Sequence, residues 1–284
     1  MKYITAFFMA WGNFLAIPCP RKIWNGEYKN LMLAMLPSVG LVHGAIVALL
    51  FGILVITVFP VYVTGFIVTL AVFGLCGFIH LDGFMDCCDA ILSRRPLEER
   101  QRILKDPNTG AFAVVSVIFL ILCWFACAVD LTEAVLLSAM KEILSGGGSL
   151  FGVSPGESAA AALLLIPVFS RGMGGLFVLT YDPIGHSQYV EDAARDDRGS
   201  CRTVIAIQLS LYTAIIAIIW LFTCGGVPLT ALGAAVMTSL GAYAGCAYAR
   251  KQLGGMSGDI AGYSICMGEA AGLLSFIAMI HLVF

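Results

Sequence analysis

Charged residues are scarce in this chain of 284 residues, in which Lys, Arg, Asp and Glu together make up 12%. A soluble globular domain carries about 25% charged residues, so the composition excludes that class. Hydrophobic residues reach 60%, and the mean hydropathy is +0.92. The chain is therefore predicted to be an integral membrane protein.

Several signature motifs are also missing. Cys87-Cys88 is accompanied by no second cysteine pair or histidine pair, and the other cysteines are scattered, which favours packing over a zinc site or a disulfide framework. No Gly-Lys-Ser/Thr follows the glycine run at 145–149, so a flexible linker is predicted there rather than a phosphate loop. The N-terminus has Lys2 but no further basic residues and no evident cleavage site, unlike a cleaved signal peptide.

Seven apolar windows are long enough to cross a bilayer as helices. They cover 38–59, 60–81, 111–129, 158–181, 203–223, 227–249 and 260–284. The first 17 residues are apolar too, but Pro18 and Pro20 end them, which favours a short interfacial or re-entrant helix. The predicted fold class is all-α: a polytopic integral membrane protein with about seven transmembrane helices plus a short N-terminal interfacial helix, forming a single transmembrane catalytic domain over 1–284.

With seven spans, 13 of the 16 Lys and Arg residues fall on one side of the membrane. They are Arg21, Lys22, Lys29, Arg94, Arg95, Arg100, Arg102, Lys105, Arg195, Arg198, Arg202, Arg250 and Lys251. The positive-inside rule makes this side cytoplasmic. We therefore expect a multi-pass protein of the cytoplasmic (inner) membrane, with its polar clusters facing the cytoplasm.

The strongest functional signal is His-Leu-Asp-Gly-Phe-Met-Asp-Cys-Cys-Asp at 80–89. Asp82, Asp86 and Asp89 follow an i, i+4, i+7 spacing, which places them within about 60° of each other around a helix. So much negative charge beside a membrane is unfavourable unless a cation binds it. Mg²⁺ prefers carboxylate oxygens and often shares its coordination shell with substrate phosphates. The stripe predicts phosphate chemistry with Mg²⁺; the alternative is solvation at a helix end or pairing with nearby arginines.

A second element, Gly-Gly-Met-Ser-Gly-Asp at 254–259, lies on the same side just before the last span. Closely spaced glycines let backbone N–H groups approach a phosphate. We therefore predict phosphate binding by Gly254, Gly255, Ser257 and Gly258. Asp259 supplies a further carboxylate for metal.

A third element is Lys-Asp-Pro-Asn-Thr-Gly at 105–110. Lys105 suits a phosphate as a point charge, Asp106 suits a metal or a hydroxyl, and Gly110 is a hinge or a position of close approach. The alternative is a surface helix over 96–105 that ends in a capped turn. The mixed-charge loop 182–202 is either solvated or a lid that faces substrate.

Arg171 and Glu269 lie within spans, both about 14–17 Å from the cytoplasmic ends. They either form a mutual ion pair, since an isolated buried charge is costly, or form the floor of a polar cavity. Arg171 is also a candidate phosphate ligand. His80 would point about 160° away from Asp82 on a continuous helix, and both His80 and His43 are interpreted as interfacial histidines with satisfied hydrogen bonds.

Together these motifs, with Ser-Arg at 170–171, resemble those of the cobalamin synthase family over essentially the whole chain. The resemblance implies a Mg²⁺-dependent membrane enzyme that joins adenosylcobinamide-GDP to α-ribazole or its 5′-phosphate and releases GMP, late in cobalamin (vitamin B12) biosynthesis. For that chemistry we assign Asp82, Asp86 and Asp259 to the metal. Asp89 or Asp106 is the candidate catalytic base.

Two positions depart from the family pattern. The family's Lys-Asp-Ser-basic-aliphatic-Gly is replaced here by a segment with Pro107, Asn108 and Thr109, which removes a basic phosphate contact; Ser257 replaces a threonine and keeps the hydroxyl. The implied partners are the small-molecule substrates and the lipid bilayer. Other enzymes of nucleotide-loop assembly and a second copy of the chain are further candidates, whereas no nucleic acid is expected.

Two other functions compete with this interpretation. A CDP-alcohol phosphotransferase of phospholipid synthesis also places aspartates on membrane helices, but its Asp-Gly-x-x-Ala-Arg is not matched after Asp82-Gly83. A cation-coupled transporter would place paired carboxylates near the bilayer midplane, whereas these lie at the end of a predicted span.

Overall fold

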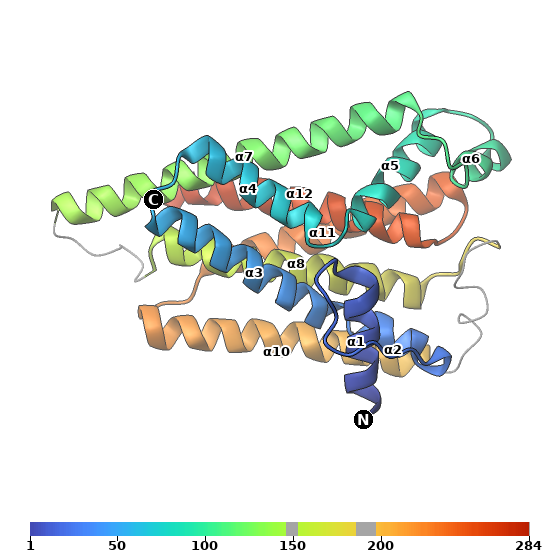
Figure 1. Ribbon diagram of the computed structural model, residues 1–284, viewed down its shortest axis with the longest axis horizontal. Coiled ribbons are helices and arrows are strands. Elements are labelled where there is room, and N and C mark those ends of the chain that lie inside the picture. The colour runs from blue at the N-terminus through green and yellow to red at the C-terminus, as the bar shows by residue number, and fades with distance from the viewer. Residues whose placement is uncertain (146–152, 186–196, 284) are drawn as a thin grey trace.

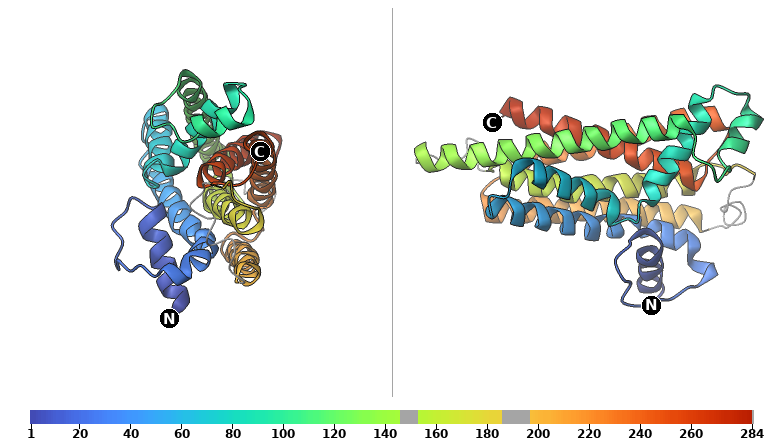
Figure 2. Two further views of the ribbon diagram at one scale, coloured as in Figure 1. Left: turned by 90° about the vertical axis from the view of Figure 1, so that its right-hand side faces the viewer. Right: turned by 45° about the horizontal axis from the view of Figure 1, so that its top comes forward.

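The computed structural model describes residues 1–145, 153–185 and 197–283, and it is built from helices. In chain order they are α1 (Lys2–Phe14), the short 3₁₀ helix η1 (Gly26–Tyr28), α2 (Lys29–Ala34), α3 (Leu36–Ile56), α4 (Val61–Gly74), α5 (Ile79–Leu92), α6 (Leu97–Ile103), α7 (Ala111–Ser145), α8 (Pro155–Thr180), α10 (Arg198–Cys224), α11 (Leu229–Leu253) and α12 (Gly258–Val283). The long helices lie side by side along one axis, while α1 crosses beside them (Figures 1 and 2). This crossing helix is the N-terminal helix predicted to be interfacial.

The predicted all-α, polytopic membrane architecture is confirmed. Six of the described helices, α3, α7, α8, α10, α11 and α12, are long and apolar enough to span a bilayer. The pair α4 and α5 also passes as one bent span, which brings the number to seven. Of the six, α8 is the most enclosed, because 78% of its apolar window is buried by the other helices.

The prediction of a continuous second span over 60–81 is wrong. Helix α4 ends at Gly74, and α5 leaves it at an angle of 83°. With 14 residues, α4 is only about 21 Å long, short of a hydrocarbon core of about 30 Å. The turn has Gly77 and Phe78 in the left-handed region, with φ of 60° and 61°. The acidic stripe therefore lies on a helix that is set across the end of the preceding one.

Two other boundaries differ from the prediction. Helix α7 contains 35 residues and is about 52 Å long, so the predicted span 111–129 is only its first part. Helix α10 begins at Arg198, five residues before the predicted start at 203. The glycine run falls mainly on 146–152, outside the described residues.

The polar loops gather at one end of the bundle. The end of α5, helix α6, the turn between α11 and α12, and the C-terminal end of α8 all lie on the right in Figure 1. The end of α3 and its connection to α4 lie at the opposite end, as does the C-terminus. The loops that carry most of the described Lys and Arg residues therefore share one end, as the sequence predicted.

Close approach between helices α5 and α12 depends on two glycines. A Cβ atom on Gly83 would lie 2.8 Å from the Cα of Asp259, and one on Gly262 would lie 3.1 Å from the carbonyl oxygen of His80. Small residues at such crossings let helix backbones approach in a membrane protein. The two glycines bring the start of α12 directly against the acidic face of α5.

Candidate active site

The acidic stripe lies on a single helix, as predicted. Asp82 is exposed near the start of α5, and Asp86 and Asp89 are half-buried one and two turns later. Asp86 experiences electrostatic repulsion from Asp82, Asp89 and also Asp259 of α12. The structure thus concentrates four carboxylates at one end of the bundle.

A pocket of about 120 Å³ joins the two acidic elements. Asp82, Gly258 and Asp259 all line it, although 176 residues lie between Asp82 and Asp259 in the sequence. The crossing at Gly83 holds these two segments together. The structure therefore places two of the three predicted metal-binding carboxylates at one opening.

The four carboxylates do not form a complete set of metal ligands by themselves. Within the described residues, no group of three or more His, Cys, Asp or Glu side chains is placed to hold an ion. Mg²⁺ is usually held by one or two carboxylates together with substrate phosphates. The donor chemistry of Asp82, Asp86 and Asp259 fits such a shared ion, and their metal role stays a prediction.

The glycine turn between α11 and α12 is fixed by its own packing. Gly254 ends α11 with φ of 80°, a conformation that favours glycine, and its N–H donates to the carbonyl of Arg250. A Cβ atom on Gly255 would lie 2.9 Å from the Ile184 side chain. Met256 donates to Asp182 and accepts from Ile184, both at 2.9 Å. Packing explains both glycines, and their predicted phosphate contact stays a prediction.

Ser257 caps the N-terminus of α12. Its hydroxyl oxygen accepts from the N–H of Ile260 at 3.3 Å and donates to Asp259 Oδ2 at 3.3 Å. The side chain is buried, with 5% exposed. Ser257 therefore orients the Asp259 carboxylate, and this contact gives the hydroxyl a role besides the predicted phosphate binding.

Helix α6 brings the third sequence element to the same end. Arg100 donates to Gln252, and Gln101 Nε2 donates to the carbonyl of Leu253 at 2.7 Å. These bonds dock α6 on the C-terminal end of α11. Lys105 follows α6 and is exposed, as its predicted role as a phosphate contact requires.

The two candidate bases have different surroundings. A Cβ atom on Gly110 would collide with the carboxylate of Asp89, so this glycine is a position of close approach, and Asp89 faces the beginning of α7. Asp106 instead accepts from the backbone N–H and the side-chain amide of Asn108, at 2.9 and 2.7 Å. These bonds lower the pKa of Asp106. A carboxylate with a lowered pKa is a weaker base, so the geometry favours Asp89.

Asp89→Asn is expected to reduce kcat at least 100-fold, whereas Asp106→Asn should reduce it less than threefold. The reason is that general-base catalysis typically contributes about 100-fold or more, and Asp106 serves mainly to form a turn with Asn108. Single-turnover rates of the two purified variants, with melting temperature as the check on folding, measure the difference. Equal losses in both variants, or a larger loss in Asp106→Asn, would refute the assignment.

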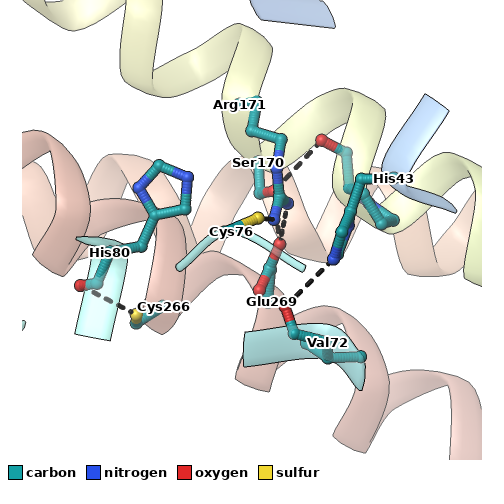
Figure 3. A network of polar contacts seen from close by, with 9 residues as sticks. His43, Val72, Cys76, His80, Ser170, Arg171, Cys266 and Glu269 are labelled. Atoms are coloured by element: carbon teal, nitrogen blue, oxygen red, sulfur yellow. Dashed lines mark hydrogen bonds and ion pairs between the residues drawn. The ribbon is translucent and has the colours of Figure 1, made fainter. Parts of the chain in front are cut away.

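Beneath the pocket lies a buried network centred on Arg171 and Glu269, which form an ion pair with 1% and 3% of their side chains exposed (Figure 3). Ser170 donates to Glu269 at 2.9 Å and accepts from Arg171 at 3.0 Å, and Arg171 also donates to Cys76 Sγ at 3.2 Å. The ion-pair alternative is therefore what the structure shows. Phosphate binding by Arg171 has no support in this geometry, because protein groups enclose its guanidinium.

The sequence suggested that His43 and His80 are interfacial histidines with satisfied hydrogen bonds, and the structure shows that this prediction is wrong for both. His43 is fully buried; its Nε2 bonds the carbonyl of Val72 at 3.0 Å, but its Nδ1 has no partner among the described residues. His80 has 8% of its surface exposed, and within the same part of the chain its Nε2 has no partner either. Burial by other helices, which periodicity cannot reveal, explains the error.

Comparison with known proteins decides the family. The family model described as cobalamin-5-phosphate synthase matches residues 6–277. The chain belongs to the cobalamin-5-phosphate synthase family. The match covers both acidic elements and the Arg171–Glu269 network, so the resemblance seen in separate motifs extends over the whole bundle.

Curated relatives agree with this assignment. An adenosylcobinamide-GDP ribazoletransferase of Clostridium perfringens strain 13 is 31% identical over 272 residues, 96% of this chain and 97% of that one. Proteins of the same name from Clostridium botulinum strain Alaska E43 and Geobacillus thermodenitrificans are 28% and 29% identical, covering 94% and 90% of this chain and 94% and 88% of their own. No solved structure matches the chain.

For this member of the cobalamin-5-phosphate synthase family, sequence reasoning missed one part of the site. The wall of the pocket beside Asp82 and Asp259 includes His80 and residues of α1 and α8, and no spacing in the sequence links those segments. The suggested lid falls largely on 186–196, outside the described residues.

Proposed function

We propose that this chain is a Mg²⁺-dependent adenosylcobinamide-GDP ribazoletransferase of the cytoplasmic membrane, with adenosylcobinamide-GDP as donor and α-ribazole or its 5′-phosphate as acceptor. The observation that carries the proposal is the shared pocket of Asp82 and Asp259 in a chain that matches the family almost from end to end. The products are adenosylcobalamin or its 5′-phosphate, and GMP.

The reaction is a phosphoryl-type transfer. A ribazole hydroxyl oxygen attacks the phosphorus attached to cobinamide, the bond from that phosphorus to the GMP oxygen breaks, and GMP leaves with the bonding electrons. Mg²⁺, when bound, neutralises the charge of the pyrophosphate. Asp82, Asp86 and Asp259 would hold the ion, and Ser257 keeps the Asp259 carboxylate oriented. Asp89 accepts the proton of the attacking hydroxyl, while Lys105 contacts a phosphate.

Product analysis tests the proposal. Purified protein in detergent is incubated with adenosylcobinamide-GDP carrying a radiolabel in its GMP moiety, α-ribazole and Mg²⁺. The expected result is labelled GMP and a cobalamin product in equal amounts, with both lost on chelation and restored by added Mg²⁺. A CDP-alcohol phosphotransferase would release CMP from a CDP-linked donor instead, and a transporter would release no nucleotide; either outcome overturns the proposal.

The site is expected to face the cytoplasm, because the 82–110 and 250–259 segments share the end rich in basic residues. Single cysteines at positions 95 and 251, in a background without native cysteines, should react with a membrane-impermeant reagent only from the cytoplasmic side. Thr57→Cys at the opposite end of the bundle is the matched control and should react only from outside. Labelling of 95 and 251 from opposite sides would contradict both the topology and the shared site.

A further inference from the structure

Helix α1 lies across the bundle instead of along it. It is seen lengthwise when the long helices are viewed end-on (Figure 2, left). Its buried residues Ala6, Met9 and Ala10 belong to the core, and the helix contacts α2 and α3. If the long helices cross the bilayer, α1 lies in the plane of the membrane, where helices with an apolar face bind at the level of the headgroups. Because α3 finishes at the end of the bundle opposite the polar loops, α1, which precedes it, lies in the leaflet nearer the candidate active site.

A pocket of about 490 Å³ lies between α1 and the loop 15–24 that follows it. The loop is fixed at both sides of this pocket. Trp11 Nε1 donates to the carbonyl of Ile17 at 3.1 Å, which ties the loop to α1. The N–H of Ala16 donates to the carbonyl of Leu75, directly after α4, at 2.8 Å. The pocket is therefore formed by the fold and is separate from the one beside the carboxylates.

One charged side chain lines this pocket. Lys22 is exposed, and it forms no ion pair with any residue that the structure describes. The local balance of charge is positive, since residues 1–28 contain Lys2, Arg21 and Lys22 but only one acidic residue, Glu27. A lysine ammonium is a compact charge that suits a phosphate group, so an anion is the expected counterpart of Lys22.

The rest of the lining is largely apolar and aromatic. Met9, Leu15 and Ile23 contribute apolar side chains. Trp24 lines the pocket and is 60% exposed, and Tyr3 on α1 is 48% exposed. Trp and Tyr are enriched where a protein meets the membrane interface, because their rings are apolar and carry one polar group. The aromatic residues thus agree with the orientation of α1 in placing the pocket at the level of the headgroups.

We propose that this pocket binds an anionic phospholipid of the surrounding leaflet, with the headgroup phosphate at Lys22 and acyl-chain carbons against the apolar side chains. Charge and position together select this occupant. Free phosphate or a nucleotide would leave the apolar wall and Trp24 in contact with water, which is unfavourable. A zwitterionic lipid would leave the excess of basic charge uncompensated. The cytoplasmic leaflet carries anionic lipids, and each Lys or Arg near its surface is attracted to them.

Quenching of Trp24 fluorescence by brominated lipid measures occupancy of the pocket. The protein is reconstituted in phosphatidylcholine bilayers with increasing fractions of brominated phosphatidylglycerol, or of brominated phosphatidylcholine with the same acyl chains. The Trp24 signal is the difference between each protein and its Trp24→Phe counterpart. We expect wild type to prefer phosphatidylglycerol about fivefold, because one Lys near an anionic lipid surface contributes about that factor in affinity. Lys22→Gln should lower the preference below twofold, whereas the control Lys251→Gln, which removes an equal charge outside the pocket, should retain it.

A second pair of variants tests the pocket without a change of charge. A Cβ atom on Gly12, which lines the pocket, would meet no atom within 4 Å, and the same is true of Gly52 in α3. Gly12→Phe should therefore fold, occupy part of the pocket and weaken phosphatidylglycerol at least threefold. The control Gly52→Phe, outside the pocket, should leave its binding unchanged.

Three results would overturn the inference. The first is equal quenching by the two lipids in wild type, and the second is a preference that survives both Lys22→Gln and Gly12→Phe. The third is loss of the preference on addition of inorganic phosphate at constant ionic strength, which would show a site for free phosphate instead of a lipid. No substrate of the proposed reaction enters the measurement, so its outcome is independent of the proposed function.

Discussion

Replacing Asp82 or Asp86 by asparagine is expected to abolish turnover while the protein stays folded. The two carboxylates lie one turn apart on α5, and Asp86 is surrounded by three other carboxylates. Such a cluster is stabilised by a cation, and an amide removes one of the charges that attract it. Neither change opens a cavity, because Asp82 is exposed and asparagine has nearly the size of aspartate. We expect at least a tenfold loss at saturating Mg²⁺, which corresponds to about 1.4 kcal/mol or more of transition-state stabilisation.

The matched control is Glu98→Gln, an exposed acidic residue of α6 at the same end of the bundle. It removes the same charge but lies outside the stripe, so its activity should stay within twofold of wild type. In a titration with Mg²⁺, the Asp82 and Asp86 variants should also need more metal for their residual activity. Retention of more than a tenth of wild-type activity at saturating Mg²⁺ would falsify the metal role.

Much of this site could be predicted because it depends on spacing along one helix and on charge counts. The i, i+4, i+7 spacing needs only that 79–92 be helical, and α5 is. The basic loops could be predicted to share one end because an even number of spans separates each from the next. The bend after α4 does not change that number. Equal depth of Arg171 and Glu269 could be counted in residues from the span ends, so their pairing could be anticipated before the helices were assembled.

Other features depend on contacts that the sequence does not encode locally. The apolar run continues without proline through 75–81, so hydropathy gives no reason for α4 to end at Gly74. Gly77, which adopts a positive φ in the turn, is the residue that could have indicated the bend. The roles of Gly255 and Gly110 depend on Ile184 and Asp89, which lie elsewhere in the chain. The environment of His80 is likewise produced by α1 and α8 together.

The Arg171–Glu269 pair connects three parts of the fold beneath the site. It joins α8 to α12, and the bond from Arg171 to Cys76 extends it to the bend between α4 and α5 (Figure 3). Gly174 and Ile265, one turn away on α8 and α12, line the pocket above it. The pair is therefore placed to fix the direction in which α5 leaves the bend, and with it the acidic stripe.

Glu269→Gln is expected to lower the free energy of unfolding by about 3–5 kcal/mol, and Arg171→Gln added to it should recover much of that loss. Breaking a buried pair leaves one charge uncompensated, whereas removing both charges leaves two neutral amides that can bond each other. A double-mutant cycle of thermal shifts in detergent measures the coupling between them. The control pair is His281–Asp130, at 2.7 Å but with 56% and 39% of the side chains exposed; exposed pairs contribute about 1 kcal/mol or less, so Asp130→Asn should change the melting temperature little.

Activity separates this structural role from direct contact with substrate. If the pair acts by holding α5, the double mutant should regain activity together with its melting temperature. If both residues instead bind substrate, the double mutant should be at least as inactive as either single mutant, with little change in melting. Near-additive destabilisation in the cycle would eliminate the ion pair as a stabilising unit. We expect coupling, because a guanidinium enclosed by Glu269, Ser170 and Cys76 is left without solvent or a counter-charge once the glutamate is neutralised.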